Sequence, residues 1–313
     1  MAAHSLGYEQ ITHAWKNLMP IKSISCVSVT SHDRSHRTKA GELFTSETRF
    51  LTVDGGHIAY DDTGGDGPLI LAIPGMGDLR SEYRLLRPIL QNSGYRVVTM
   101  DVRGFGETSA QWPDYSAHAV GRDALTLIEY LQAGSAVILG NSFAAGAALW
   151  AAHDAPMHVR GVVLLGPIVR DLHVSWFAML ALQLGFAGPW RIWFWVTYWN
   201  SLFPTRKPVD QGRVKAAITK NLREPGRIAA LRTMIGLSKA DTVALIPRSR
   251  VPALVVMGSR DPDFPDAKAE AQWLATQLHA DSVMIDGAGH YPHTEMPERV
   301  APELLSFIER VHD

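Results

Sequence analysis

Residues 136–152 constrain the fold most, because they read as a buried strand that passes through a sharp turn directly into a helix. The first part, 136–139, is too continuously apolar to alternate, which is typical of a strand covered on both faces. The part from Ala144 onward is rich in alanine and free of proline until Pro156, which predicts a helix. Ser142 therefore lies on a turn between a central strand and a covering helix.

A turn of this kind forces strained dihedral angles on its central residue and brings the following backbone very close. Small residues two positions to either side of Ser142, here Gly140 and Ala144, leave room for this approach. The run Gly-Asn-Ser-Phe-Ala resembles the nucleophile elbow of the α/β-hydrolase family, whose usual form is G-x-S-x-G, with alanine in place of the second glycine. A chance match in an alanine-rich junction is the alternative, so the rest of the chain has to decide.

The composition predicts one large globular α/β domain with room for a smaller insertion. The chain has 313 residues, of which 46% are hydrophobic and 19% are charged, as in folded proteins. A formal net charge of -1 offers no footprint for nucleic acid and no polybasic membrane patch. The single cysteine, Cys26, excludes an internal disulfide and a thiolate metal cluster, and the first 20 residues carry no long apolar core typical of a signal peptide. We therefore expect a cytoplasmic protein that binds no metal.

Strands and helices alternate along most of the chain, which predicts a mostly parallel, doubly wound sheet. A helix is expected at 85–90, with Pro88 as a possible kink. The other expected elements are a hairpin at 49–60, strands at 69–73, 95–100, 136–139, 161–165, 251–257 and 281–285, and helices at 119–132, 267–278 and 297–311.

The alternation stops between residues 168 and 246, where mainly helical segments follow one another. We interpret this segment as a helical cap inserted into an α/β core that comprises 47–167 and 247–313. Residues 1–46 mix polar residues without a sustained period, and we expect them to be a partly disordered N-terminal extension.

Two loops supply partners for Ser142. A serine hydroxyl is a weak nucleophile unless a base removes its proton, and the base needs a third group that fixes its tautomer. Asp261 and His290 each follow a predicted strand, in the order along the chain that this fold uses. The run Gly-Ser-Arg-Asp ending at Asp261 resembles the acid loop of the family, and Gly-Ala-Gly-His-Tyr-Pro-His around His290 resembles its histidine loop. The resemblance implies Ser142 as nucleophile, His290 as base and Asp261 as acid.

Some of these assignments have rivals. The glycines before His290, and its place straight after a strand, favour it over His293. Three other carboxylates stay open as the acid: Asp171, Asp263 and Asp266.

Acyl transfer also needs donors aimed at the developing oxyanion. The family uses the backbone N–H after the serine, which is here that of Phe143, and one in the loop after the earlier strand, which is here that of Met76. That loop has Pro-Gly where His-Gly is common, but a backbone donor survives such a change. Serine at the elbow also argues against dehalogenases and epoxide hydrolases of this fold, because these place aspartate there.

The predicted cap has an unusual composition. It holds five of the nine tryptophans, and residues 174–203 carry one charge, Arg191. Packing of the cap helices on the core and on each other is the favoured interpretation, and Trp193 and Trp195 are candidates for the wall of an apolar acyl pocket. Two glycines and a proline disfavour a membrane span, and contact with a lipid surface is the least favoured interpretation.

The resemblance covers about residues 48–313 and implies a capped α/β-hydrolase. We expect a serine carboxylesterase that acts without a cofactor on hydrophobic, uncharged small molecules through an acyl-enzyme. Lactone opening, carbon–carbon bond hydrolysis or perhydrolysis by the same residues are the alternatives within enzymes, and a small-ligand receptor is the alternative outside them. The sequence indicates neither a natural substrate nor an oligomeric state.

Overall fold

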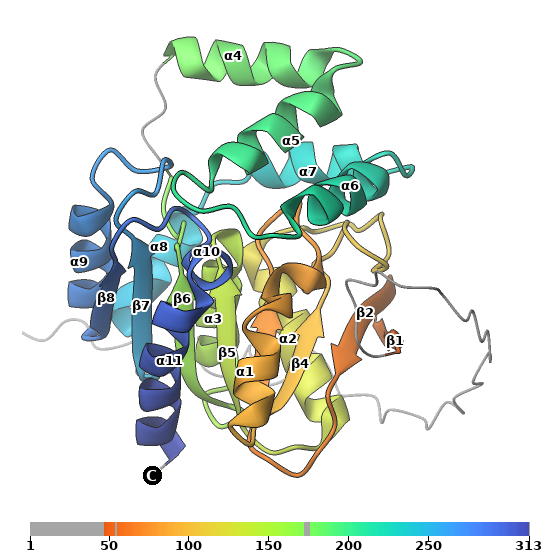
Figure 1. The fold of residues 1–313 in the computed structure, drawn as a ribbon. Helices are drawn as coiled ribbons and strands as arrows, with labels where there is room; N and C mark the ends of the chain where they lie inside the picture. The colour runs from red at the N-terminus through yellow and green to blue at the C-terminus, as the bar shows by residue number, and fades with distance from the viewer. Residues whose placement is uncertain (1–46, 54, 172–175, 313) are drawn as a thin grey trace, which may run out of the picture. The chain divides into compact units, whose positions relative to one another are not determined.

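The computed structural model describes residues 47–53, 55–171 and 176–312, and these contain a sheet of eight strands in the order β1-β2-β4-β3-β5-β6-β7-β8 (Figure 1). The first two strands form an antiparallel hairpin, β2 is also antiparallel to β4, and all the other neighbours run parallel. The strands are β1 (Arg49–Val53), β2 (Gly56–Asp62), β3 (Leu69–Ile73), β4 (Arg96–Met100), β5 (Ala136–Asn141), β6 (Val159–Leu165), β7 (Ala253–Gly258) and β8 (Asp281–Ile285).

Helices cover both faces of this sheet. One face packs against α2 (Ala117–Leu131), α3 (Phe143–Asp154) and α9 (Ala267–Leu278), and the other packs against α1 (Arg87–Asn92) and α11 (Pro297–His312). In β5, Ile138 enters the first of these two cores while Val137 and Leu139 enter the second. Because side chains alternate across a strand, a strand that feeds two cores has no polar side, which explains its continuous apolar sequence.

The predicted α/β-hydrolase architecture is confirmed, and each predicted strand lies where we expected it. The expectation for Pro88 is wrong. The segment before it forms a short 3₁₀-helix, η1 (Arg80–Arg84), and Pro88 lies in the first turn of α1, which it does not kink. Proline is tolerated there because the first N–H groups of a helix have no intrahelical acceptor.

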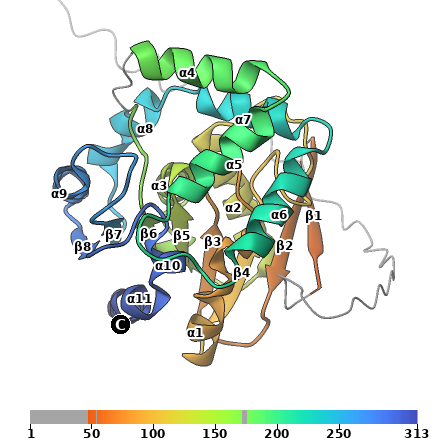
Figure 2. The ribbon, with the colours of Figure 1, turned by 45° about the horizontal axis from the view of Figure 1, so that its top comes forward.

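Five helices lie between β6 and β7 in the described part of the chain: α4 (Trp176–Ala187), α5 (Arg191–Ser201), α6 (Gln211–Leu222), α7 (Arg227–Ile235) and α8 (Ala240–Leu245). A short 3₁₀-helix, η2 (Ile246–Arg248), follows them, and a four-residue helix, α10 (Pro292–Glu295), precedes α11. Figure 2 shows α5 crossing above the ends of the central strands.

The helical content expected between 168 and 246 is thus observed, whereas a separate cap domain with these boundaries stays a prediction. The expected extension at 1–46 lies outside the described residues. None of the described helices combines the length and the apolar composition that crossing a bilayer requires.

Candidate active site

Ser142 occupies a strained turn between β5 and α3. Its φ of 55° and ψ of -120° lie outside the regions that residues with a side chain prefer. The strand passes into the helix within this one residue, and the backbones on either side almost touch. A Cβ added to Gly140 would lie 2.3 Å from the carbonyl oxygen of Ala144. Glycine is therefore required at 140, whereas alanine fits at 144.

Backbone hydrogen bonds hold Ser142 in this conformation. Its N–H donates to the carbonyl oxygen of Leu165 at the end of β6, at 2.9 Å. Its own carbonyl oxygen accepts from the N–H groups of Ala145 and Ile168, both at 3.1 Å. The turn is thus fixed from α3 and from the neighbouring strand, and this stabilises the strained dihedral angles.

His290 and Asp261 form a buried pair on the loops that follow β8 and β7. The Nδ1 atom of His290 lies 2.8 Å from Oδ2 of Asp261, and both residues are at most 3% exposed. A carboxylate only accepts, so Nδ1–H donates to Asp261, and in the neutral imidazole Nε2 is then the nitrogen without a proton. This is the tautomer that a general base requires.

Asn141 links the turn to the histidine loop. Its side-chain nitrogen donates to the carbonyl oxygen of His290 at 3.2 Å and to that of Leu165 at 2.9 Å. Strand β6 pairs in parallel with β5 and with β7, and β7 pairs in parallel with β8. The loops that follow β5, β7 and β8 therefore leave the same edge of the sheet. The structure therefore brings Ser142, Asp261 and His290 together at that edge.

A second carboxylate flanks His290. Oδ2 of Asp263 lies 3.5 Å from Nδ1 of His290, and the Tyr198 hydroxyl on α5 donates to both Asp263 oxygens at 2.8 and 2.9 Å. Burial lowers the pKa of His290, but the negative charges of Asp261 and Asp263 outweigh it, so that the pKa of His290 is raised to about 9. Burial also raises the pKa of Asp263.

The other rivals lie in different surroundings. Asp171 is exposed and accepts hydrogen bonds from the Ser238 hydroxyl at 2.8 Å and the Lys239 N–H at 3.1 Å. Asp266 caps the start of α9 by accepting from the N–H of Ala269 at 2.9 Å. Neither arrangement orients a histidine.

The loop after β3 runs beside the serine. A Cβ added to Gly75 would lie 3.4 Å from Cβ of Ser142. Met76 follows in this loop, and its side chain is half-buried. Phe143 begins α3, so its N–H has no acceptor within the helix. Met76 thus follows Gly75, which borders the turn, and Phe143 follows Ser142, which forms it. These are the two residues expected to supply the oxyanion donors.

Sequence reasoning missed a buried network beneath this loop. Oε2 of Glu82 accepts from the N–H of Gly75 at 2.8 Å, and Oε1 lies 2.8 Å from Nε2 of His293. Burial raises the pKa of Glu82 to about 8 and lowers the pKa of His293 to about 3. Tyr83 stacks on the His293 ring at 4.9 Å. This rival histidine therefore supports the loop through Glu82.

A further acid, Asp78, joins this network to the cap. Its Oδ2 accepts from the indole N–H of Trp199 on α5 at 2.9 Å, and its Oδ1 accepts from the N–H of Leu79 at 2.7 Å. Burial, with the nearby Glu82 carboxylate, raises the pKa of Asp78 to about 7. No family motif marks these positions. The signal that could have found them is the presence of two acids, Asp78 and Glu82, in the segment between the predicted buried strand 69–73 and the helix after it.

The two candidate pocket tryptophans lie on different sides of α5. Trp195 is 7% exposed and packs on the loop after β3, where a Cβ added to Gly77 would lie 2.7 Å from its ring. Trp193 is 69% exposed. The structure therefore brings Trp195 to the neighbourhood of Met76 and leaves Trp193 on the surface.

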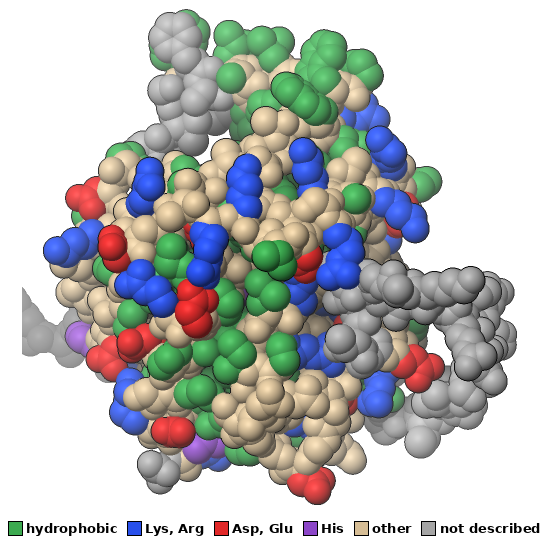
Figure 3. Space-filling view, viewed as in Figure 1, with side chains coloured by type: hydrophobic (Ala, Val, Ile, Leu, Met, Phe, Trp, Pro, Cys, Tyr) green, Lys and Arg blue, Asp and Glu red, His purple; other side chains and the backbone are tan. Residues whose placement is uncertain are grey.

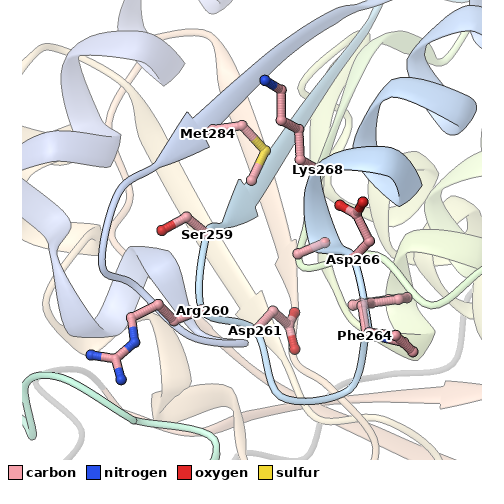
Figure 4. A pocket seen from close by; sticks show the side chains of 9 residues that line it. Ser259, Arg260, Asp261, Phe264, Asp266, Lys268 and Met284 are labelled. Carbon is pink, nitrogen blue, oxygen red and sulfur yellow. The ribbon is translucent and has the colours of Figure 1, made fainter.

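An open hollow of about 550 Å³ lies beside the acid loop (Figure 4). Its lining includes Asp261 but neither Ser142 nor His290, so we do not assign it to a substrate. The residues around it are Ser259, Arg260, Asp261, Phe264, Pro265, Asp266, Ala267, Lys268 and Met284.

A sequence profile described as the alpha/beta hydrolase family matches residues 70–303, which is most of the chain and includes Ser142, Asp261 and His290. The chain belongs to this family. Its members carry several chemistries on one fold, and the relatives of this chain reflect that range.

Two relatives are named for different substrates. A 2-hydroxy-6-oxo-6-(2'-aminophenyl)hexa-2,4-dienoic acid hydrolase from Metapseudomonas resinovorans is 27% identical, over 85% of this chain and 92% of its own length. A 3-oxoadipate enol-lactonase from Acinetobacter baylyi is 21% identical, over 65% and 75%.

Solved structures agree on the fold. A thermophilic esterase from Thermogutta terrifontis superposes with a TM-score of 0.69 at 23% identity, covering 86% of this chain and all of the esterase chain. Likeness at this level of identity extends to the fold alone.

Proposed function

We propose that this α/β-hydrolase is a serine carboxylesterase that acts on hydrophobic, uncharged esters through an acyl-enzyme. The observation that carries the proposal is the strained turn of Ser142 at the same sheet edge as the buried His290–Asp261 pair. A serine held in this way has its hydroxyl presented beyond the end of the sheet, where a histidine with a free Nε2 can activate it.

The reaction proceeds in two steps. Oγ of Ser142 attacks the ester carbonyl carbon while Nε2 of His290 takes the hydroxyl proton. The oxyanion accepts hydrogen bonds from the N–H groups of Phe143 and Met76. The intermediate collapses, the carbon–oxygen bond to the alcohol breaks, and His290 returns the proton to the departing alkoxide. Water, deprotonated by His290, then attacks the acyl carbon. The bond from this carbon to Oγ of Ser142 breaks, the acid leaves, and His290 returns the proton to Oγ.

The pH dependence of this reaction follows from the two carboxylates near His290. The base works only when His290 is neutral. We therefore expect kcat/KM to rise with pH through a midpoint at about 9 and to level off above it. Asp263→Asn removes one charge that raises the pKa of His290, while the amide oxygen can still accept from Tyr198. The midpoint should then move to lower pH in kcat/KM profiles of the variant. An unchanged midpoint would show that the charge of Asp263 does not raise the pKa of His290.

Trp195 gives the substrate preference its physical basis. Its ring packs on the loop that carries Met76, so an apolar acyl chain at the oxyanion donors would meet a large apolar surface. We expect Trp195→Ala to weaken transition-state binding of medium-chain esters by about 1–3 kcal/mol while sparing acetate esters.

The matched control is Trp193→Ala, because it removes the same side chain from the exposed side of the same helix. This variant should keep the wild-type profile when kcat/KM is measured over a series of acyl chain lengths. A uniform loss in Trp195→Ala across the series, with a lower melting temperature, would make Trp195 a packing residue only.

Lactone opening and carbon–carbon bond hydrolysis are second candidates, because relatives of this chain are named for them. All three reactions begin at a carbonyl group and can use the same base. The test compares kcat/KM for nitrophenyl esters of graded chain length, aliphatic lactones and a vinylogous diketone. We expect the esters to be preferred. If a lactone or the diketone were the better substrate by about tenfold or more, a difference of about 1.4 kcal/mol in transition-state binding, the reaction named here would be wrong.

A further inference from the structure

Large apolar side chains gather on the outer side of α4 and on the turn into α5. We call the five residues that form this surface the α4–α5 patch. Figure 3 shows hydrophobic side chains gathered at the top of the molecule, where these two helices lie. Their exposed fractions are 66% for Trp176, 45% for Leu180, 58% for Leu184, 53% for Trp190 and 69% for Trp193.

The patch is unusual in its density. Among the described residues, five of the nine exposed large hydrophobic side chains lie between residues 176 and 193. Single exposed apolar residues are ordinary on a protein surface, whereas a contiguous group marks a place where another surface binds. Trp176, Leu180 and Leu184 are spaced by four, so they form one stripe along α4. No charged residue interrupts α4.

The segment of the chain that contains the patch is strongly positive. Residues 168–246 contain eleven Lys and Arg against four Asp and Glu, a net charge of +7, although the whole chain carries -1. Figure 3 shows Lys and Arg side chains below and beside the patch. Exposed cations of this segment include Arg191, Lys215, Lys220, Arg223 and Arg232.

We propose that the α4–α5 patch docks on an anionic lipid surface, with its tryptophans and leucines in the interface and the cations of α5–α7 near the headgroups. Tryptophan favours the boundary between water and hydrocarbon, and anionic lipids attract nearby Lys and Arg. Docking lies in the plane of the membrane, because the 12 residues of α4 span only about 18 Å.

A second copy of this chain fits the patch less well. In a two-fold dimer each patch would face its own equivalent, so two segments of charge +7 would meet. Like charges oppose such an interface, whereas they add to the attraction of an anionic bilayer. The charge therefore selects the lipid surface as the occupant.

The inner side of α5 connects this surface to the site. Trp195 packs on the loop that carries Met76, and Tyr198 and Trp199 hydrogen-bond Asp263 and Asp78. A helix that would contact lipid, α5, is thus also the helix that packs on the loop carrying Met76 and that hydrogen-bonds Asp263 beside His290. Docking itself does not depend on the proposed esterase activity, and its test uses no substrate.

The experiment is flotation of the full chain with two kinds of vesicle, phosphatidylcholine alone and phosphatidylcholine with roughly 30% phosphatidylglycerol. The test variant combines Trp176→Ser, Leu180→Ser and Leu184→Ser. The control is Met157→Ser, which removes another apolar side chain, 80% exposed, from the turn after α3. A charge variant combines Lys215→Gln, Lys220→Gln and Arg223→Gln. Circular dichroism verifies that each variant is folded.

We expect the wild type and Met157→Ser to bind the anionic vesicles and to be released by high salt. The triple serine variant should bind on the order of 100-fold more weakly, and the charge variant about fivefold more weakly for each cation removed. The proposal is overturned if the wild type does not bind anionic vesicles, or if the triple serine variant binds as the wild type does. It is also overturned if light scattering finds a dimer that this variant converts to a monomer.

Discussion

Ser142→Ala is expected to lower the turnover of an ester about 10⁶-fold and to leave the fold intact. The variant keeps the His290–Asp261 pair and the backbone of the turn, so only the nucleophile is lost. The measurement is the steady-state rate on a chromogenic ester beside a thermal melt. A variant that kept most of the wild-type rate would show that another residue attacks the ester.

Ser142→Gly serves as the matched control for stability. It lacks the hydroxyl too, but glycine adopts a φ of 55° without strain. We expect it to be as inactive as the alanine variant and more stable, by about 1–3 kcal/mol. A lower stability than that of Ser142→Ala would contradict the strain assigned to the turn.

Asp261→Asn is expected to cost about 10⁴ in kcat. The asparagine fits the same space, but its amide favours the other histidine tautomer and no longer stabilises the imidazolium. Asp263 lies 3.5 Å from the same nitrogen, so Asp263→Asn should retain far more activity.

Asp171→Asn completes the comparison, since its carboxylate binds Ser238 and Lys239. It should leave kcat near the wild-type value. All three variants are compared on one ester at the pH optimum of each, so that a shifted pKa of His290 is not counted as a loss. A greater loss of kcat from Asp263→Asn or Asp171→Asn than from Asp261→Asn would show that the residue with the greater loss, and not Asp261, orients His290.

The fold was predictable because the burial of its strands determines which residue types they contain. A strand such as β5 feeds two cores and is therefore apolar throughout, which distinguishes it from a half-exposed strand. The elbow was predictable for a similar reason, since the close approach of Ala144 leaves no room for a side chain at 140. Loops that follow parallel strands then had to meet at one edge.

Contacts between distant loops were not predictable in this way. The bond between Glu82 and His293 joins residues 211 positions apart, and neither residue carries a local signal of the other. The position of Asp263 beside His290 depends on the course of a loop within a few ångströms. The resemblance of Gly-Ser-Arg-Asp to the acid loop of the family ranked Asp261 before Asp263 but did not show that both would influence the pKa of the histidine.

Helical geometry could have separated the two tryptophans. Residues two apart on a helix do not share a face, so Trp193 and Trp195 were poor candidates for one pocket wall. The structure places Trp195 against Gly77 and leaves Trp193 exposed. A different argument applies to α4. A helix this apolar is expected to be buried on all sides, yet Trp176, Leu180 and Leu184 are exposed.

Labelling with a fluorophosphonate tests the central claim most directly, because the reagent requires an activated serine and no knowledge of the substrate. Intact-mass spectrometry before and after labelling, followed by peptide mapping, locates the adduct. We expect a single adduct on Ser142 of the wild type and none on Ser142→Ala. A wild type that stays unlabelled would indicate a binding protein with an inert serine, and an adduct on another serine would contradict the assignment of Ser142.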